Sequence, residues 1–291
     1  MHSLRPEFLN KLSFSQDMLS TISTIGEFKG KQQLFYTQTP DILDSLKQVA
    51  LIESVESSNR IEGVTAPHKI IEGIVFRDAF PKDRPEEEIA GYREALAHIH
   101  ASAIHLKLNV DLILQLHTII NRFVVPGPSR FKNSENEIVE KNPDMTVKQI
   151  RFKTVSAVNT PRYMEELIEY YNLAINRDRR EPLLVIPLFV LDFLCIHPFE
   201  NENGRVSRLL TVLLLYHFGY EVGRFISHER VIEESKATYY ESLHKSSINW
   251  HDSKHDPFPW LRYFWGVLIR SYGEFEERVG KIRKGRGSKT E

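Results

Sequence analysis

The stretch His197-Pro198-Phe199-Glu200-Asn201-Glu202-Asn203-Gly204-Arg205-Val206-Ser207-Arg208 decides how this chain folds. It follows the apolar run 187–194 and precedes the apolar run 209–218, which ends before Gly219. Two apolar runs at this spacing predict two buried helices joined by a short loop, with Gly219 as the C′ residue of the second. A loop between buried helices has no packing reason to carry so many polar groups, because each needs a partner or loses solvation. We therefore predict a functional site in this loop.

The residue types of the loop indicate chemistry on a phosphate group. Asn203 and Gly204 open the second helix, where free backbone N–H groups and the helix dipole favour an anion. Arg205 and Arg208 are three residues apart, near one face of that helix, and their guanidinium groups can fork onto phosphate oxygens. His197, at the other end of the loop, is placed to act as a general base toward a group that attacks the phosphate. In outline this is a phosphate-transfer site.

The run resembles the signature of the Fic (Fido) family, which reads His-Pro-Phe-x-Asp/Glu-Gly-Asn-Gly-Arg-x-x-Arg. Two positions depart from it: Asn201 stands where the family has its acidic metal ligand, and Glu202 stands where a small residue is usual. The positions that match by identity and spacing are His197, Pro198, Phe199, Asn203, Gly204, Arg205 and Arg208. The resemblance covers most of residues 40–270. It implies a mainly α fold, the Fic/Fido helical bundle with a small β-hairpin flap beside the active site.

The same resemblance implies an activity. Most Fic proteins are protein adenylyltransferases, nucleotidyltransferases that move the AMP part of ATP onto a Tyr, Ser or Thr hydroxyl of a target protein. Carried over residue by residue, His197 would deprotonate that hydroxyl and Phe199 would anchor the loop in the core. Tyr239 and Tyr240 resemble the region that packs around the nucleotide base, with core packing as the equal alternative. The nucleotide phosphates would be bound by Asn203, Gly204, Arg205 and, at the γ-phosphate, Arg208.

The metal ligands depart most from the family pattern. Mg²⁺ prefers hard anionic oxygens, and the amide oxygen of Asn201 is a neutral, weaker ligand. Glu200 or Glu202 could replace it, although residues one position away point elsewhere on a tight loop. Glu202 also brings negative charge to the place where anions should bind. We therefore expect ATP as the substrate with weak dependence on Mg²⁺, or low activity.

A second motif lies upstream, at the end of a helix that the apolar spacing predicts over residues 41–61. Ser58 and Glu62 are four residues apart and share a helix face, and Gly63 can end the helix. The segment resembles the inhibitory motif Ser/Thr-x-x-x-Glu-Gly/Asn of those Fic proteins in which this helix precedes the catalytic core. The resemblance implies that Glu62 pairs with Arg208 in place of the γ-phosphate. The alternative is an ordinary helix end with Glu62 in water.

One β-hairpin is predicted among the helices. Residues 137–140 and 147–155 alternate in polarity around a turn cluster at 142–144. A lone hairpin is marginally stable, so it must pack on the helices. The resemblance implies that it is the flap, whose edge would hold a segment of the target protein in extended form by strand addition. The alternative is a hairpin without a role in binding.

The other segments predict further helices and the domain organisation. Gly26 and Gly30 are expected to break any long element, leaving a short helix within residues 6–25. The basic, glycine-broken segment 281–289 is expected to be disordered, with a weak nucleic-acid or membrane contact as the open alternative. Further helices are predicted over 67–76, 86–108, 110–120, 161–176, 232–245 and 260–281. The predicted regions are an N-terminal helical region with the inhibitory helix (1–108), a Fic/Fido catalytic core (109–250), a C-terminal helix (251–280) and a basic tail (281–291).

Four residues admit a functional interpretation that their surroundings do not favour. Cys195 ends an apolar helix and His117 lies on an apolar helix face, so both are interpreted as core residues, not as a nucleophile and a ligand. His251 and His255, with carboxylates nearby, could bind a metal ion. Two prolines follow them directly, however, and a surface loop is favoured.

The composition bounds the class of protein. The 291 residues carry 38 basic and 39 acidic side chains, a formal net charge of −1, so the overall charge does not indicate a nucleic-acid partner. A single cysteine excludes an intramolecular disulfide and fits a reducing compartment. Neither a signal peptide nor a membrane span is visible. We expect a cytoplasmic protein that acts on a protein target, independent of membranes, with homo-oligomers left open.

Other functions stay open at this level. Fic proteins include members that move a different phosphate-containing group and members that remove AMP from a target. From another class, the protein could bind nucleotide without turnover as a regulatory or interaction module. Asn201 and Glu202 favour this module, whereas His197 and Arg208 favour catalysis. A DNA-binding regulator would need a winged helix or a basic recognition helix after residue 270, where too few residues remain.

Overall fold

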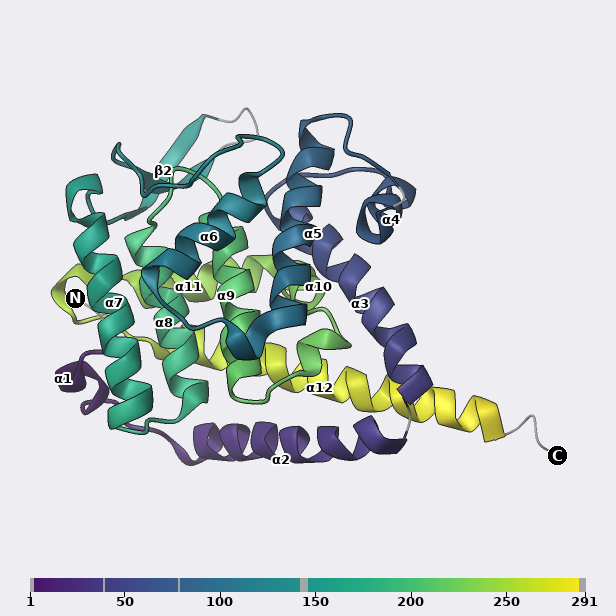
Figure 1. Cartoon of the computed structure of the whole chain (residues 1–291). Coiled ribbons are helices and arrows are strands. Elements are labelled where there is room, and N and C mark those ends of the chain that lie inside the picture. Colours follow the sequence, from purple (N-terminus) through teal and green to yellow (C-terminus); the bar gives the residue numbers. More distant parts are fainter. Residues whose placement is uncertain (1–2, 39, 78, 142–145, 288–291) are drawn as a thin grey trace.

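The computed structural model describes residues 3–38, 40–77, 79–141 and 146–287, whose arrangement is shown in Figure 1. Within these ranges the fold is mainly α, with one two-stranded antiparallel sheet, and the predicted class is confirmed. The strands are β1 (Glu137–Lys141) and β2 (Val147–Lys153). The α-helices are α1 (Pro6–Leu9), α2 (Gln16–Gln38), α3 (Pro40–Ile61), α4 (His68–Phe76), α5 (Arg84–Ser102), α6 (Val110–Asn121), α7 (Thr160–Asn172), α8 (Pro182–Ile196), α9 (Asn203–His217), α10 (His228–Glu234), α11 (Lys236–Ser247) and α12 (Phe258–Gly287).

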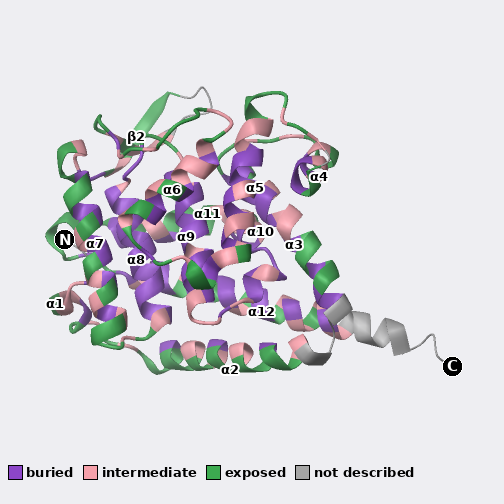
Figure 2. Cartoon of the chain, viewed as in Figure 1, coloured by how far each residue is buried: buried purple, intermediate pink, exposed green. Residues whose placement is uncertain are grey.

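Helices α8 and α9 form the centre of the molecule, as the two apolar runs predicted. Every residue of α8 from Leu183 to Ile196 is buried, and α9 is buried continuously from Arg205 to Leu210 (Figure 2). A helix that is apolar on all sides must be surrounded by other elements. Here α5, α7, α11 and α12 pack against this pair. The chain has one continuous apolar core, which extends from Leu4 to Val279.

Pro187 lies inside α8 and shows how α12 is attached to it. Proline has no N–H, so the carbonyl of Leu183 loses its helical hydrogen-bond donor. The indole N–H of Trp265 donates to that carbonyl instead, at 2.8 Å. The indole N–H of Trp260 donates to the Pro187 carbonyl at 2.7 Å. Trp265 of α12 therefore supplies the donor that α8 lacks at Leu183, and Trp260 adds a second hydrogen bond between the two helices.

The N-terminal helices lie around this centre. In Figure 1, α2 lies along one side of the bundle next to α12, and the two helices contact each other. Helix α3 packs against α5 and α10, and it also contacts α9. This packing brings the end of α3 to the start of α9, where the sequence predicts the functional site.

The predicted hairpin is confirmed. Ile138 pairs with Phe152 and Val139 pairs with Ile150, with irregularities in the register on either side of Val139–Glu140. The hairpin lies at one end of the bundle (Figure 1), and β2 contacts α11. The turn predicted at 142–144 lies outside the described residues.

The prediction that glycines break the N-terminal helix is wrong. Helix α2 continues through Gly26 and Gly30 to Gln38. A Cβ at either glycine would meet nothing within 4 Å, so neither residue is required by a close contact. Glycine lowers helix propensity by about 1 kcal/mol, which packing of a residue such as the fully buried Ile25 overrides.

Two other boundaries differ from the predictions. The helix predicted over 232–245 is divided into α10 and α11 at Ser235, whose hydroxyl donates to the Val231 carbonyl at 2.8 Å. Serine competes with the helical backbone in this way. The segment predicted to be disordered from residue 281 continues α12 as far as Gly287. The remaining predicted helices are present, with α7 prolonged by a π-helical turn, Leu173–Arg177.

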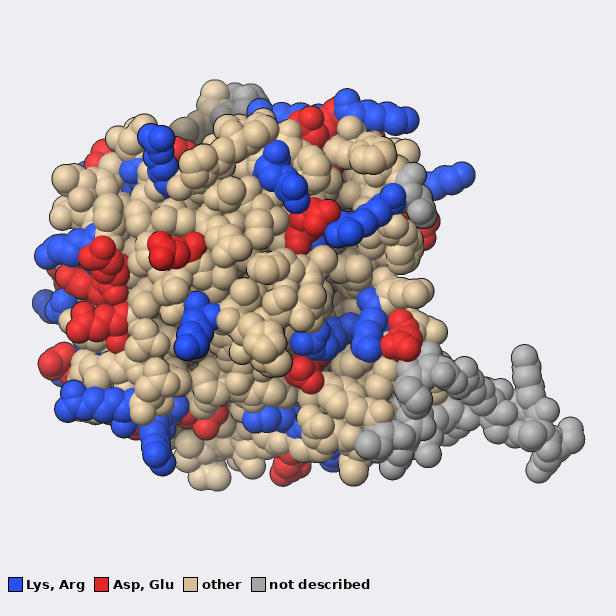
Figure 3. Space-filling model, in the orientation of Figure 1, with Lys and Arg blue, Asp and Glu red and all other residues tan. Residues whose placement is uncertain are grey.

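Charge is mixed on the surface. On the face shown in Figure 3, Lys and Arg side chains alternate with Asp and Glu side chains, and no area carries a single sign. No described helix combines the length with the apolar character that crossing a bilayer requires.

The contact between α5 and α6 gives a prediction. Helices α5 and α6 meet at Gly91, where a Cβ would lie 1.8 Å from the carbonyl oxygen of Ile120. Gly91→Ala must push the helices apart, and we expect a loss of about 2 kcal/mol in the free energy of unfolding. Gly266→Ala is the control, because a Cβ there meets nothing within 4 Å. It should add about 0.5–1 kcal/mol. Urea denaturation measures both, and a wild-type midpoint for Gly91→Ala would contradict this packing.

Candidate active site

The loop between α8 and α9, residues 197–202, is here called the signature loop. Its first and last residues have left-handed backbone, with φ of 54° at His197 and 70° at Glu202. This costs a non-glycine residue about 1 kcal/mol, so the surroundings must hold the loop in shape. Asn203 does so: its Oδ1 accepts from the Phe199 N–H at 3.0 Å, and its Nδ2 donates to the Phe199 carbonyl at 2.8 Å. The side chain predicted to bind phosphate is thus used within the loop.

Phe199 is fully buried, as predicted for the loop anchor. Its ring stacks on the imidazole of His117, with centroids 3.8 Å apart and an interplanar angle of 14°. The Nδ1 atom of His117 lies 2.7 Å from the Ser129 hydroxyl. Burial lowers the pKa of His117 to about 4, so its ring is neutral at physiological pH. His117 is therefore a packing partner of the loop, in agreement with its interpretation as a core residue.

His197 has the geometry of a general base. Its Nδ1 lies 3.2 Å from the Leu194 carbonyl, which can only accept a hydrogen bond. The ring proton is therefore assigned to Nδ1, which leaves Nε2 as the basic nitrogen. Burial lowers the pKa of His197 to about 4, so the imidazole is uncharged and ready to take a proton at neutral pH.

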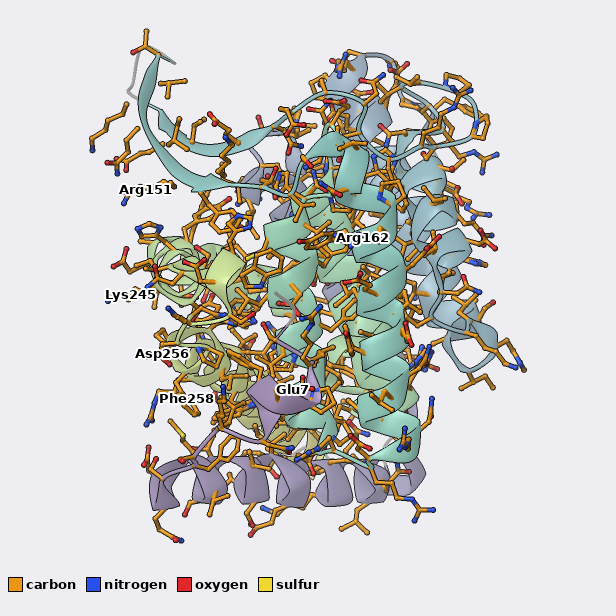
Figure 4. All side chains as sticks on the ribbon, turned by 90° about the vertical axis from the view of Figure 1, so that its left-hand side faces the viewer. Glu7, Arg151, Arg162, Lys245, Asp256 and Phe258 are labelled. Atoms are coloured by element: carbon orange, nitrogen blue, oxygen red, sulfur yellow. The ribbon has the colours of Figure 1, made fainter. Side chains whose placement is uncertain are left out.

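His197 lines a cleft of ≈ 670 Å³ between the signature loop, the hairpin and α11. The hairpin contributes Ile138 and Arg151 to the lining, and α11 contributes Tyr240. In Figure 4, Arg151 on β2 lies above Lys245 on α11 at the same edge of the molecule. The cleft is large enough for a ligand of nucleotide size.

The structure brings Glu62 and Arg208 together at the side of this cleft. Arg208 is buried, and its Nη2 donates to Glu62 Oε1 at 2.9 Å. Its Nε donates to the Ser58 hydroxyl and its Nη2 also donates to the Ser58 carbonyl, each at 2.9 Å. Burial opposes the positive charge, but the Glu62 carboxylate raises the pKa of Arg208 above its ordinary value. Nη1 is buried and has no hydrogen-bond partner among the described residues.

Gly204 makes room for the Glu62 carboxylate. A Cβ at this position would lie 2.3 Å from Glu62 Oε1 and 3.3 Å from Arg208 Nη1. The carboxylate therefore packs on the first turn of α9, whose N–H groups have no acceptor within the helix. The positive end of the helix dipole also favours an anion there. Glu62 occupies an anion position built by α9.

The end of α3 fixes where Glu62 lies. Gly63 has φ of 85°, and the N–H of Val64 donates to the Asn59 carbonyl at 3.0 Å, which closes the helix in the manner of a Schellman cap. Lys236 Nζ donates to the Ile61 carbonyl at 2.6 Å. Gly63 is therefore the C′ residue that the sequence predicted.

Arg205 is bound by three protein side chains. Its Nη1 donates to Asn59 Oδ1 and its Nη2 donates to Glu88 Oε2, each at 2.7 Å. Glu202 forms an ion pair with its Nε and also accepts a hydrogen bond from its Nη2. Burial raises the pKa of Glu202 and the charges of Glu88 and Glu62 add to this, while Arg205 acts in the opposite direction. In this state the guanidinium of Arg205 is not free for a phosphate.

The carboxylates beside Asn201 do not form a metal site. Glu200 Oε1 accepts from the N–H groups of Asn133 and Ser134 and from the Ser134 hydroxyl, at 3.0–3.2 Å. Glu202 is bound by the neighbouring guanidinium. Asn201 is exposed and offers a neutral oxygen. Across the described residues no group of three His, Cys, Asp or Glu could hold a metal ion. The donor set does not fit Mg²⁺, and the prediction that Glu200 or Glu202 replaces the missing carboxylate is not supported.

Three other candidates line the same cleft. Cys195 is buried, and burial raises the pKa of its thiol well above the ordinary value, so it is a core residue and not a nucleophile. Tyr239 is buried and Tyr240 is 44% exposed, with ring centroids 5.1 Å apart. Tyr239 thus packs in the core, while Tyr240 presents its ring to the cleft.

The two histidines near the C-terminal helix have structural partners. The ring of His251 stacks on Phe152 of the hairpin, and its Nε2 lies 2.7 Å from the Lys153 carbonyl. The predicted surface loop is present, since residues 251–254 and 256 are exposed. His255 itself is buried, with its ring stacked on Phe8.

Sequence reasoning missed several polar residues of the site. The signal at Asn59 was its place next to Ser58 in the upstream motif, where an asparagine at a helix end is frequently a capping group. Nothing in a single sequence pairs the carboxylate of α5 with Arg205, because the two are more than a hundred positions apart. The residues missed are Asn59, Glu88, Lys132, Asn136 and Thr154.

Comparisons with known proteins agree with this geometry. Residues 107–215 match the Fic/DOC family. Protein adenylyltransferase fic-1 of Caenorhabditis elegans is 23% identical over 209 residues, which are 69% of this chain and 35% of that protein. The chain thus spans little more than a third of the length of this relative.

Two solved structures are similar to the whole bundle. A Fic family protein from Desulfovibrio desulfuricans has a TM-score of 0.73 at 18% identity, over 91% of this chain and 76% of that chain. A Fic domain containing signaling protein from Bacteroides thetaiotaomicron has a TM-score of 0.70 at 22% identity, over 89% of this chain and 98% of that chain. At these identities they show the fold, and the predicted Fic bundle with its hairpin is confirmed.

The left-handed backbone at Glu202 gives a prediction for the signature loop. Glu202→Gly and Glu202→Ala both remove the carboxylate from Arg205, but only glycine adopts φ of 70° without steric strain. We expect the Gly variant to be more stable than the Ala variant by about 1 kcal/mol. The free energies of unfolding in urea measure this difference. Equal stabilities would show that the loop does not impose the left-handed conformation.

Proposed function

We propose, from the premise that residues 107–215 of this chain form a Fic/DOC domain, that the protein transfers AMP from ATP to a hydroxyl group of a target protein. The observation that carries the proposal is the buried guanidinium of Arg208, whose Nη1 has no acceptor among the described residues. Its partner Glu62 lines the same cleft as the neutral base His197. A buried donor without an acceptor fits a site where a ligand supplies one, and phosphate oxygens suit a guanidinium best.

In the proposed reaction the target hydroxyl oxygen attacks the α-phosphorus of ATP. The bond from that phosphorus to the bridging oxygen breaks, and pyrophosphate leaves. His197 Nε2 takes the hydroxyl proton, because its Nδ1 is held by the Leu194 carbonyl. The N–H groups in the first turn of α9 stabilise the charge that develops on the phosphate oxygens. The residues of the chain position the reactants and neutralise the charge on the phosphates, and no covalent enzyme intermediate is required.

Glu62 acts as the brake in this proposal. Its carboxylate occupies the anion position over Gly204, which the γ-phosphate must enter. The γ-phosphate would then replace the Glu62 carboxylate as the anion bound to Arg208, so the net charge around the guanidinium would change little. Two of the three hydrogen bonds of Arg208 go to Ser58, and these keep the guanidinium in place during the exchange.

The target segment is proposed to lie along the flap in extended form. A two-stranded hairpin leaves edge N–H and C=O groups for strand addition. On β2, Val147 and Ile150 are 58% and 55% exposed, which is unusual for branched apolar side chains and fits coverage by a partner.

A second candidate function is nucleotide binding without turnover, as a regulatory or interaction module. The observation in its favour is that Arg205 is already bound by Glu88, Glu202 and Asn59 while the described loop residues lack a donor set for Mg²⁺. Transfer of another phosphate-containing group, or removal of AMP from a target, would use the same residues. The mass of the product separates these reactions.

The proposal is tested by the intact mass of Glu62→Gly after incubation with ATP and Mg²⁺. We expect a gain of one AMP unit on the protein itself or on an added target, at a rate at least about tenfold above wild type, because Arg208 is released. Glu62→Gln keeps a hydrogen-bonding group of the same size and should release less activity. The control is Glu62→Gly with His197→Ala, which should gain nothing. A phosphate-sized gain would indicate a kinase, and ATP binding without any gain would favour the second candidate.

The metal dependence gives a separate prediction in the Glu62→Gly background. Asn201→Asp restores an anionic oxygen, so Mg²⁺-dependent transfer should rise about tenfold, whereas Asn201→Ala should not raise it. Rates are measured over a series of Mg²⁺ concentrations. Identical rates and identical Mg²⁺ dependence for the Asp and Ala variants would show that the side chain at position 201 does not limit the reaction.

A further inference from the structure

Lys132 lies before the flap and binds two carbonyl groups at the start of the signature loop. Its N–H donates to the Pro198 carbonyl at 2.8 Å. Its ammonium Nζ donates to the Ile196 carbonyl at 3.1 Å. These two carbonyls flank His197, so one residue holds the backbone on both sides of the proposed base.

Asn136 binds the other carbonyl groups of the same stretch. Its Nδ2 donates to the Phe199 carbonyl at 3.0 Å and, at a longer 3.4 Å, to the His197 carbonyl. All four carbonyls from residue 196 to residue 199 thus accept hydrogen bonds from the segment that leads into the flap. Left-handed backbone at His197 needs such support, because it is strained by itself.

The same ammonium also holds the root of the flap. Lys132 Nζ donates to Thr154 Oγ1 at 2.9 Å and to Asn136 Oδ1 at 2.8 Å. Thr154 directly follows β2, and Asn136 directly precedes β1. The Thr154 hydroxyl donates in turn to the Asn136 carbonyl at 2.7 Å. Both ends of the hairpin therefore meet at Lys132.

Burying an ammonium group at this position costs solvation free energy. Lys132 is 4% exposed, and the acceptors of its ammonium group are the neutral oxygens of Asn136, Thr154 and Ile196. Burial lowers its pKa to about 8, although the charges of Glu135 and Glu200 act in the opposite direction. Packing alone would be served better by an apolar side chain. The lysine is explained instead by the three oxygen acceptors that surround its Nζ atom in a fixed arrangement.

We propose that Lys132 is a positioning residue that holds the signature loop and the root of the flap as one unit. It thereby fixes the imidazole of His197 relative to the target segment on the flap. The proposal rests on the proposed function for the reaction it serves, while the unit itself is defined by hydrogen bonds between described residues.

The ammonium also acts on His197 through its charge. The pKa of His197 is lowered first by burial and further by the Lys132 charge, while the Leu194 carbonyl and the Glu62 carboxylate act in the opposite direction. Removal of the positive charge must therefore raise the pKa of the imidazole. The pKa of His197 therefore reports whether the ammonium group lies next to the imidazole in the folded protein.

The first test is an NMR titration of the His197 ring, assigned by its loss in His197→Gln. Lys132→Met keeps the aliphatic stem but removes the charge, and it should raise the pKa of His197 above its wild-type value. Lys132→Arg keeps the charge and should stay close to wild type. The matched control is Lys69→Met, an exposed lysine on α4. An unchanged His197 pKa in folded Lys132→Met would overturn the proposal.

Wild-type protein gives the same information if Lys132→Met does not fold. The His197 ring shift should show a second inflection when Lys132 loses its proton, because burial lowers the pKa of Lys132 to about 8. The absence of a second inflection between about pH 7 and pH 11 would overturn the electrostatic link.

The coupling to the flap is tested by amide hydrogen exchange. Thr154→Val removes one acceptor of Lys132 and the bond that closes the flap root. We expect the exchange of the hairpin amides at 138–141 and 147–152 to accelerate about tenfold or more, with α8 unchanged. Flap exchange equal to wild type would overturn the coupling.

Kinetics in the Glu62→Gly background separate positioning from nucleotide binding. Lys132→Met should lower kcat for AMP transfer by about 100-fold while KM for ATP changes by no more than about twofold. A fall in ATP affinity with unchanged kcat would contradict a positioning role. If no variant transfers AMP, the proposed function fails, but the titration and the exchange still decide the role of Lys132.

Discussion

Two buried guanidinium groups at the start of α9 impose the strongest constraint on this fold. A guanidinium removed from water needs acceptors around its edge, and the N-terminus of a helix offers only donors. Apart from Glu202 of the signature loop, the acceptors for Arg205 and Arg208 come from α5 and from the end of α3 with the residue after it, as Glu88, Ser58, Asn59 and Glu62. The docking of α3 and α5 on α9 therefore satisfies charge as well as burying apolar surface. This explains why the polar motif upstream lies at the end of α3 and not elsewhere.

The carboxylates of this cluster differ in how far they are buried, and this difference indicates which of them can be displaced. Glu62, Glu88 and Glu202 pair with Arg205 and Arg208, and Glu88 also pairs with Arg84. Glu62 has the most exposed side chain of the three, at 32%, against 14% and 10% for the other two. Arg208 keeps its two bonds to Ser58 without it. Glu62 is thus the anion that can leave at the smallest cost. An entering polyphosphate would add charge beside Glu202, whose pKa is already raised, and would favour its protonation or displacement.

The sequence predicted the helices, the loop and the hairpin around the site better than it predicted the hydrogen-bond partners of the side chains within it. The spacing of apolar runs predicted α8, α9 and the loop between them, and the short-range motifs predicted the cap at Gly63 and the hairpin. Helix breaks were predicted poorly, because tertiary packing overrides propensity at Gly26 and a side-chain hydrogen bond ends α10 at Ser235. The partners of Arg205 and the oxygens around Lys132 were not predictable. They depend on contacts between distant segments, about which one sequence carries no pattern.

In the signature loop, the residues that fix the backbone are different from the residues that set the charge. Phe199 and Asn203 build its shape, the first by burial and the second by closing the backbone on itself, and both match the family pattern. The departures, Asn201 and Glu202, lie on positions that face solvent or a guanidinium and contribute nothing to that closure. A chain can therefore adopt this loop while its chemistry differs. What the departures change is the charge around the proposed phosphate position, since one removes an anion beside the loop and the other adds one against Arg205. In the proposed reaction these two charges and the neutral state of His197 would set the rate, whereas Phe199 and Asn203 close the loop without them.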